Sequence, residues 1–372
     1  MRGSIFQPRP YLLLSHTRLR HVFRSFAKLN TFDPFENESQ EGKGGKDAEA
    51  EEEPLYLHRS RGQHLLTNQR VLDAIVGKAG VERTDTVLEI GPGTGNLTLT
   101  LLHHVRHVIA VEIDQRMIRA LNSRASMLGL AHQLTVISGD ALKTQFPPFD
   151  LCVANIPYGI SSPLIAKLLF DQTITPFRNA TLLLQKEFAS RLLARPGDSA
   201  FNRLAVNVQL VAHVQHLMGV SKRDFVPCPK VDSSLVKIVP NSVKPNVDLK
   251  EWWAFTRTCF CKKNKTLGAI FRQKKKVLEL MKRRSMVRKG GNDECGFVFE
   301  DDESEDDGEE GEGVEVKGGE VSEFKEKVLS VLKDGGYEDK RPSKLSIDQF
   351  LHLLTMFNNG GIRFHARYFE AH

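Results

Sequence analysis

The sequence predicts an α/β fold with a doubly wound, mostly parallel sheet, followed by a small C-terminal helical domain. Short apolar runs alternate with amphipathic stretches between about residues 55 and 242, and this alternation is typical of parallel sheets covered by helices. A glycine-rich turn follows the first apolar run. Beyond residue 242 only helical periodicity remains, which predicts that the sheet ends there.

The elements of the sheet region follow one another in a regular order. The stretch "NQRVLDAIVGKAG" has apolar residues at helical spacing and ends on a glycine suited to a C-cap. The stretches "DTVLEIG" and "HVIAVEID" are apolar runs of strand length. Strands are predicted at 85–91, 107–114, 134–140, 149–159 and 179–188, and helices at 68–80, 93–104 and 115–126.

Composition narrows the class of protein. Of the 372 residues, 40% are hydrophobic and 26% are charged, which fits a globular core. The net charge of +6 favours an anionic partner. Five cysteines, an odd number without the spacing of zinc ligands, favour a reducing compartment and no structural metal. No apolar run approaches the length of about 18 residues that spans a bilayer, so no membrane partner is expected.

The N-terminal part has the composition of a leader followed by a linker. Residues 1–32 contain six Lys and Arg and no acid before Asp33, which is typical of an organellar transit peptide. We expect import into the mitochondrial matrix, with plastid or nucleolus as alternative locations and an ordinary disordered N-terminus as the other interpretation. Residues 33–54 are acidic and predict a disordered linker before a domain at 55–242.

Charge is strongly segregated in the C-terminal part. Residues 257–290 contain thirteen Lys and Arg against one acid, Glu279, whereas residues 293–315 contain thirteen acids and no Lys or Arg. Like-charge blocks of this density usually stay disordered. The acidic block therefore predicts a disordered insertion at about 291–320 within a helical domain that spans 243–372.

A nucleoside site is indicated at the ends of three successive predicted strands. Gly91, Gly93 and Gly95 directly follow the first strand, where glycines let a ligand approach the backbone. Glu112 near the end of the second strand can accept the hydroxyls of a ribose, and Asp140 at the end of the third can accept from an adenine amino group. Each acid alone is more often a solvated strand end. The glycine spacing differs from the dinucleotide pattern G-x-G-x-x-G, which leaves S-adenosylmethionine as the favoured cofactor.

The stretch "NIPYG" ends the fourth predicted strand, and its chemistry suits the acceptor of a methyl group. The exocyclic nitrogen of adenine is a weak nucleophile because its lone pair is delocalised into the ring. The side-chain oxygen of Asn155 and the carbonyl of Ile156 can accept the two N–H bonds of that amine and localise the lone pair. Pro157 fixes the turn, and Tyr158 can stack on the base. An ordinary strand-to-loop turn is the alternative interpretation.

Taken together, these motifs resemble the ribosomal RNA adenine N6,N6-dimethyltransferase family in its eukaryotic branch. The resemblance includes "GQHLLTNQRVLDAIV", "LEIGPGTGNLT", "NIPYGISSPL", "FVPCPKVDSSLVKI" and "KNKTLGAIF". It implies a Rossmann-like methyltransferase sheet and a small helical RNA-binding domain. It also implies that Phe225 lies on the face of the target adenine opposite Tyr158. Methyl-donor contacts are implied at His64, Leu66, Gly91, Glu112, Asp140 and Asn155.

The same resemblance implies a function and its partners. Members of the family use S-adenosylmethionine to dimethylate two adjacent adenines in a 3′-terminal hairpin of small-subunit ribosomal RNA. We expect this RNA and the pre-ribosomal small subunit as partners, a monomeric protein and a role in mitochondrial ribosome biogenesis. A non-catalytic ribosome-assembly or mitochondrial transcription factor on the same fold is the alternative. Antibiotic-resistance methyltransferases of the large subunit are a minor alternative, against which the segment "KNKTL" argues.

Three further features of the sequence each have a functional and a purely structural interpretation. The basic stretch at 262–289 is expected to contact RNA phosphates, with a solvated helix face as the alternative. Trp252 and Trp253 are expected to pack inside the helical domain rather than to stack on bases. The histidines near the end of the second predicted helix are expected to be polar surface; they are His103, His104 and His107.

Overall fold

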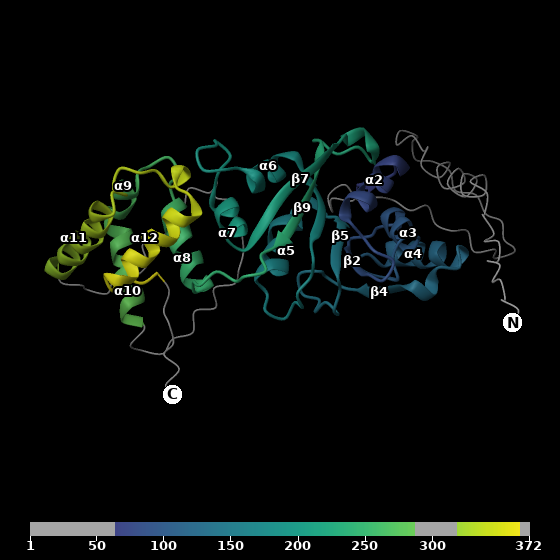
Figure 1. Cartoon of the computed structure of the whole chain (residues 1–372), viewed down its shortest axis with the longest axis horizontal. Helices are drawn as coiled ribbons and strands as arrows, with labels where there is room; N and C mark the ends of the chain where they lie inside the picture. Colours follow the sequence, from purple (N-terminus) through teal and green to yellow (C-terminus); the bar gives the residue numbers. More distant parts are fainter. Residues whose placement is uncertain (1–63, 287–317, 365–372) are drawn as a thin grey trace, which may run out of the picture. The chain divides into compact units, whose positions relative to one another are not determined.

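The computed structural model describes residues 64–286 and 318–364, all within the compact unit that spans residues 57–372 (Figure 1). The predicted transit peptide, the acidic linker and most of the predicted acidic insertion lie outside the described residues. Within the described ranges, no helix is long and apolar enough to cross a membrane.

Among the described residues, the central sheet has seven strands (Figure 1). They are β2 (Thr86–Ile90), β3 (His107–Glu112), β4 (Leu134–Ser138), β5 (Leu151–Asn155), β6 (Ala180–Gln185), β7 (Ala212–Val220) and β9 (Ser233–Pro240). Their order across the sheet is β4-β3-β2-β5-β6-β9-β7. The strands from β4 to β6 pair in parallel, whereas β9 and β7 pair antiparallel at one edge. The predicted mostly parallel, doubly wound sheet is therefore confirmed, and the antiparallel pair is an addition to it.

The two faces of the sheet pack into two apolar cores. In β2, Val87 packs in one core, and Leu88 and Ile90 pack in the other, because successive side chains of a strand alternate between faces. The helices that contribute to the first core are α2 (Gln69–Ala79), α3 (Asn96–Leu102) and α4 (Gln115–Met127). Those that contribute to the second are α5 (Ser161–Phe170), α6 (Lys186–Leu193) and α7 (Arg203–Val211). Coverage of both faces explains the nearly continuous apolar runs of the central strands.

Helix α2 has the glycine C-cap that its sequence predicts, and the structure adds an N-cap at Asn68. The Asn68 side chain accepts a hydrogen bond from the Arg70 backbone N–H at the start of the helix. Gly80 follows the last helical residue with φ +73°, a left-handed conformation that glycine adopts without strain. These caps fix where the chain enters α2, directly after the segment that borders the functional site.

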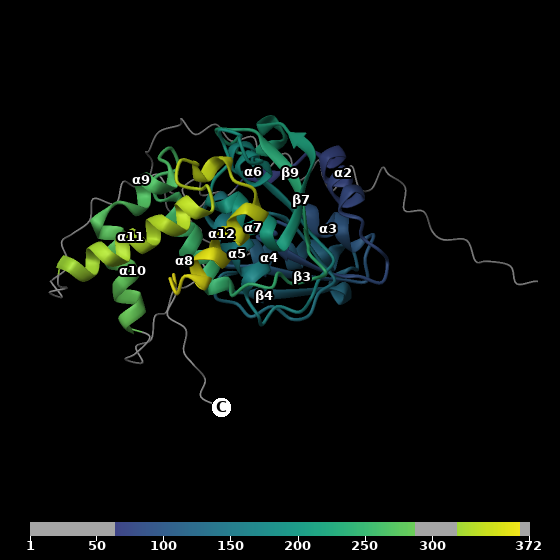
Figure 2. The same ribbon diagram turned by 60° about the vertical axis from the view of Figure 1, so that its left-hand side comes forward.

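The C-terminal helices share one core with the sheet. They are α8 (Leu249–Phe260), α9 (Leu267–Phe271), α10 (Lys274–Met286), α11 (Gly318–Asp334) and α12 (Ile347–Asn359), and α9 to α12 lie side by side (Figures 1 and 2). Trp252 and Trp253 of α8 are both buried, as predicted. The Thr256 hydroxyl donates to Asn207 Oδ1 of α7 at 3.0 Å. One continuous apolar cluster therefore joins the region beyond residue 242 to the sheet.

A second, two-stranded sheet ties the start of the described chain to a distant loop. Strand β1 (Leu65–Leu66) pairs antiparallel with β8 (Phe225–Val226). Next to this pair, Asn68 Nδ2 donates to Asp224 Oδ1 at 2.7 Å. The pairing holds residues 64–68 beside the carboxyl ends of β2 and β5, where the predicted site lies.

Candidate active site

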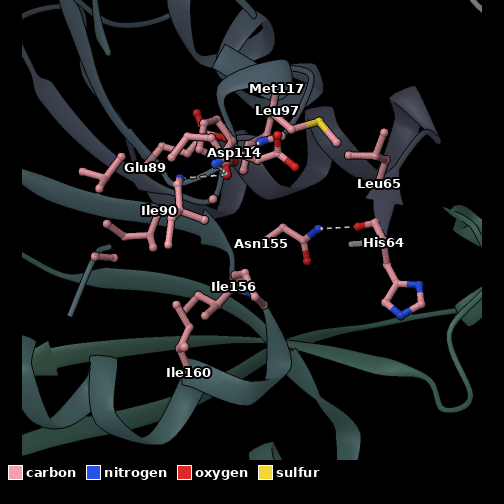
Figure 3. A pocket seen from close by; sticks show the side chains of 18 of the residues that line it. His64, Leu65, Glu89, Ile90, Leu97, Asp114, Met117, Asn155, Ile156 and Ile160 are labelled. Carbon is pink, nitrogen blue, oxygen red and sulfur yellow. Dashed lines mark hydrogen bonds between the residues drawn. The ribbon is translucent and has the colours of Figure 1, made fainter. Parts of the chain in front are cut away.

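A cavity of about 320 Å³ opens at the carboxyl ends of β2, β3 and β5 (Figure 3), the edge at which open parallel sheets bind ligands. Ten of the twelve residues predicted for the site line this cavity. They are His64, Leu66, Gly91, Gly93, Glu112, Asp140, Asn155, Ile156, Pro157 and Tyr158. The fold therefore brings the glycine turn, the two acids and the "NIPYG" loop together in one place.

The glycine turn after β2 forms a tightly packed wall of the cavity. Gly91 has φ +66° and Gly93 has φ +56°, a left-handed backbone that disfavours other residues. A Cβ atom at Gly91 would lie 3.1 Å from Pro157 Cδ, and one at Gly93 would lie 2.7 Å from Leu65 Cδ2. Glycine is therefore needed at both positions, and it lets a ligand lie directly against the backbone.

The Glu112 carboxylate is held in place by three backbone N–H groups. Its Oε1 accepts from Ile113 and Asp114, each at 2.9 Å, and its Oε2 accepts from Gly93 at 3.1 Å. A carboxylate offers about four acceptor positions. Oε2 therefore keeps one position for a hydroxyl group of a ligand in the cavity.

Glu89 also lines the cavity, although it is not among the residues predicted for the site. Its side chain is 1% exposed, and its Oε2 has no hydrogen-bond partner among the described residues. Burial, together with the nearby Glu112 carboxylate, raises the pKa of Glu89 to about 8. The signal was present in "DTVLEIG", because an acid inside an apolar strand is costly to bury unless it has a partner.

The loop that carries Asp140 is fixed by a lysine on α5. Asp140 Oδ1 accepts from the Leu142 backbone N–H at 2.9 Å, which leaves Oδ2 for a ligand. The Lys167 ammonium donates to three carbonyls of the same loop, at 2.9 Å to Ala141, 3.1 Å to Leu142 and 2.5 Å to Thr144. Lys167 thereby links the helix that follows the "NIPYG" loop to the acid predicted to hold an adenine.

The "NIPYG" loop follows β5, and hydrogen bonds orient the polar groups of the loop. Asn155 Nδ2 donates to the His64 carbonyl at 3.2 Å, and the Asn155 side-chain oxygen points the other way, toward Ile156 (Figure 3). The Tyr158 hydroxyl lies 2.9 Å from Ser233 Oγ. Burial raises the pKa of Tyr158, so its phenol stays neutral. An amide oxygen and an aromatic ring are thus presented at the same cavity.

Two of the residues predicted for the site do not line the cavity. Phe225 is 2% exposed and packs in the same core as Leu66; its place on the face of the target adenine opposite Tyr158 stays an expectation of the resemblance. Gly95 has φ +88° and caps the start of α3, where a Cβ atom would overlap Leu121. Gly95 therefore lies on the side of the glycine turn that packs against Leu121 and does not border the cavity.

The donor set of the cavity fits S-adenosylmethionine. The glycine wall allows close approach of a ligand, and the acceptor oxygens of Glu112 and Asp140 suit ribose hydroxyls and an amino group. The Glu89 Oε2 atom, which has no hydrogen-bond partner among the described residues, can accept a hydrogen bond from a cationic group. Ile113 lines the cavity with 67% of its surface exposed, which offers an apolar contact to a flat base.

Comparison with known proteins agrees with this geometry. A family model described as "Ribosomal RNA adenine dimethylase" matches residues 55–290. A "Ribosomal RNA small subunit methyltransferase, mitochondrial" of Arabidopsis thaliana is 56% identical over 316 residues, which are 85% of this chain and 82% of the relative. A "Ribosomal RNA small subunit methyltransferase" of the same plant is 50% identical over 330 residues, or 83% of this chain and 93% of the relative.

A solved structure of a related protein has a similar fold. The crystal structure of a dimethyladenosine transferase from Plasmodium falciparum matches with a TM-score of 0.66 and 39% sequence identity. The match covers 81% of this chain and 99% of that one. Sequence, fold and the cavity at the strand ends agree, and the chain belongs to the ribosomal RNA adenine dimethylase family.

Proposed function

We propose that the protein transfers methyl groups from S-adenosylmethionine to the N6 atoms of two adjacent adenines in a 3′-terminal hairpin of small-subunit ribosomal RNA. The product is N6,N6-dimethyladenosine. The orientation of Asn155 is the observation that carries this proposal. A carbonyl can only accept, so the Asn155 Nδ2 must face the His64 carbonyl, and the side-chain oxygen is left for an amine.

The donor end of the cavity has a role for each polar group. S-adenosylmethionine supplies an electrophilic methyl group on a sulfonium when it is bound. Oε2 of Glu112 accepts a ribose hydroxyl, and Oδ2 of Asp140 accepts from the amino group of the donor's adenine. Gly91 and Gly93 border the donor with their backbone, and Glu89 provides a carboxyl group for its cationic part.

The acceptor end prepares the target amine. The Asn155 side-chain oxygen and the Ile156 carbonyl accept the two N–H bonds of the adenine amine, which localises its lone pair on nitrogen. Tyr158 stacks on the base after it is flipped out of the RNA. Rate enhancement comes mainly from positioning. The methylated amine releases one proton to water. It then keeps one N–H bond, so the second transfer uses only one of the two acceptors.

The proposal extends to partners and location. The protein acts as a monomer on small-subunit RNA within the pre-ribosomal small subunit. The word "mitochondrial" in the name of the 56% identical relative supports a mitochondrial location, and so does the acid-free, arginine-rich composition of residues 1–32. We place the protein in the matrix; plastid and nucleolus remain the alternatives to be tested.

Methyl transfer can be tested directly. Full-length protein is incubated with methyl-labelled S-adenosylmethionine and unmodified small-subunit RNA or pre-ribosomal small subunits, and the digested RNA is analysed by mass spectrometry. Dimethyladenosine at two adjacent positions is the expected product. Binding to the subunit without any methylated adenosine would instead identify a non-catalytic assembly factor. Transfer to large-subunit RNA would favour the resistance-type activity.

A further inference from the structure

Three backbone carbonyls converge on the side chain of Lys167. The ammonium donates to the carbonyls of Ala141, Leu142 and Thr144 at 2.9, 3.1 and 2.5 Å. An ammonium has three N–H donors and no acceptor, so these three bonds use all of its donors. The same ammonium lies 4.3 Å from the centroid of the Phe146 ring, which is close enough for a cation–π contact. Every polar group of this side chain is therefore bound to one loop.

The same loop carries Asp140, and hydrogen bonds within the loop fix its shape. The Asp140 carbonyl accepts from the backbone N–H groups of Lys143 and Thr144 at 3.0 and 2.8 Å, and from the Thr144 hydroxyl at 2.8 Å. Asp140 Oδ1 accepts from the Leu142 backbone N–H at 2.9 Å. A loop closed on itself in this way still needs contacts that place it on the rest of the molecule, and the bonds from Lys167 tie it to α5.

The bonds from Lys167 do something that apolar packing cannot do. Ala141 and Phe146 are buried in the same core as Leu164 of α5. Apolar contacts are not directional, so they hold the loop against the helix without fixing where its polar atoms point. Hydrogen bonds are directional. Burial lowers the pKa of Lys167, because a charged group loses hydration there. An apolar side chain would attach the loop without that cost, which indicates a role for the direction of the bonds.

We propose that Lys167 is a positioning residue for the methyl donor. By holding the loop of residues 140–146 on α5, it places Asp140 Oδ2 where this atom accepts a hydrogen bond from the adenine amino group of the donor. This inference rests on the proposed function. Lys167 does not line the cavity, so it acts on the donor through the loop. It thereby sets the preference of the site for a donor whose purine carries an amino group.

Three variants separate this role from a general effect of charge. Lys167→Met keeps the approximate length of the side chain and removes its three donors. Lys143→Met is the matched control, because Lys143 lies in the same loop, is exposed and does not line the cavity. Lys167→Arg keeps the positive charge, but a planar guanidinium cannot direct three N–H bonds to carbonyls that converge on one point. It gives the same comparison if Lys167→Met does not fold.

The test uses two ligands that differ in one group. They are S-adenosylhomocysteine and its analogue with hydrogen in place of the adenine amino group. In calorimetry, the full-length wild type should bind S-adenosylhomocysteine about tenfold more tightly, since the analogue lacks a hydrogen bond to a charged acceptor. Lys167→Met and Lys167→Arg should bind S-adenosylhomocysteine about tenfold more weakly than the wild type does, and the analogue within about threefold of it. Lys143→Met should match the wild type with both ligands.

Steady-state methyl transfer gives a second readout. In Lys167→Met and Lys167→Arg, KM for S-adenosylmethionine should rise by about tenfold, while kcat at saturating donor should stay within about threefold of the wild type. A residue that positions only the donor affects the binding of the donor. The reacting amine of the RNA is held elsewhere in the cavity.

Four outcomes would overturn this inference. Equal losses of affinity for both ligands in Lys167→Met would indicate general structural support. An unchanged preference for the amino group in both Lys167 variants would show that the loop keeps its position without the lysine. Loss of the preference in Lys143→Met would assign the effect to surface charge. Equal binding of both ligands by the wild type would remove the role of Asp140. Failure of the proposed function is a separate result, because the wild type would then bind neither ligand or would transfer no methyl group.

Discussion

Glu89 places a carboxyl group between Leu88 and Ile90, two fully buried apolar side chains of β2. Side chains alternate along a strand, so Glu89 points toward the face that α3 covers, while its two neighbours pack in the other core. The protonated form of a buried carboxyl is easier to accommodate than the charged form, which is why its pKa is raised. At the scale of single residues, the protein thus keeps a titratable group at its proposed donor site.

Glu89→Gln is expected to flatten the dependence of folding stability on pH in the ligand-free protein. The pKa of Glu89 is about 8 in the folded protein against an ordinary value of 4.5, so between these values the folded chain keeps a proton that the unfolded chain releases. Its contribution to stability is fully present below about pH 4.5 and is lost as the pH rises toward 8. Urea unfolding should show that the stability of the wild type relative to Glu89→Gln falls by a few kcal/mol between about pH 5 and about pH 8. A constant difference would contradict the assignment.

Glu112→Ala is expected to weaken binding of S-adenosylmethionine by about tenfold or more, or about 1.4 kcal/mol. The substitution removes the ribose acceptor and the group that holds the Gly93 backbone N–H at 3.1 Å. Calorimetry measures the affinity, and thermal unfolding checks that the variant is folded. Glu187→Ala, which removes an exposed acid of α6 that does not line the cavity, is the control and should bind normally. Equal affinity of both variants would place the donor elsewhere.

At the scale of elements, the lysines at the start of α10 differ in their surroundings. Lys274 and Lys275 are exposed. Lys276 is partly buried, and its ammonium lies 3.0 Å from the Glu279 carboxylate. An exposed ammonium can contact a phosphate and release counterions, whereas a partly buried one contributes less to RNA affinity.

Replacing Lys274 and Lys275 by Ala should therefore weaken binding to all RNAs and lower the slope of log affinity against log salt by up to about one unit per lost contact. Lys276→Ala is the matched comparison and should change the slope less. Binding titrations at several salt concentrations measure both effects. If the double variant keeps the slope of the wild type, this face of α10 does not contact RNA.

Which elements could be predicted from sequence depends on how local their signals are. Strand β2 and helix α2 were predicted because their apolar periodicity, and for α2 the C-cap at Gly80, lie within a few residues. The β1–β8 pair was not predicted, since each strand has two residues and the partners are far apart in sequence. The position of the Phe225 ring depends on that pairing, so no local signal could fix it. Strand β7 was not predicted either, because His213 and His216 are exposed and disrupt a clean alternation.

At the scale of the whole molecule, the change from strands to helices after β9 is not a break in packing. Phe255 of α8 and Phe350 of α12 belong to the same apolar cluster as Leu182 of the sheet. The Lys344 ammonium of the C-terminal region donates to the Gly197 carbonyl at 2.9 Å. The predicted domain boundary near residue 242 therefore stays a prediction. The proposed catalytic part and the proposed RNA-binding part share one apolar core.

Residues 1–32 are expected to direct import into mitochondria and to be dispensable for methyl transfer, because their positive, acid-free composition is that of a transit peptide. A fluorescent reporter fused to this segment should co-localise with mitochondria. The same fusion with Arg18, Arg20 and Arg24 replaced by Gln is the control and should lose that location. A reporter that stays cytosolic, or enters plastids or the nucleolus, would contradict the mitochondrial assignment.

The central claim is that the Asn155 side-chain oxygen acts on the reacting amine. Single-turnover methyl transfer to small-subunit RNA, followed by mass spectrometry of nucleosides, tests it with Asn155→Ala against the wild type. We expect transfer to slow by about a hundredfold or more, because the amine loses its acceptor. RNA affinity should stay largely unchanged, because it comes mainly from phosphate contacts elsewhere. Dimethyladenosine formed by Asn155→Ala at the wild-type rate would contradict the account.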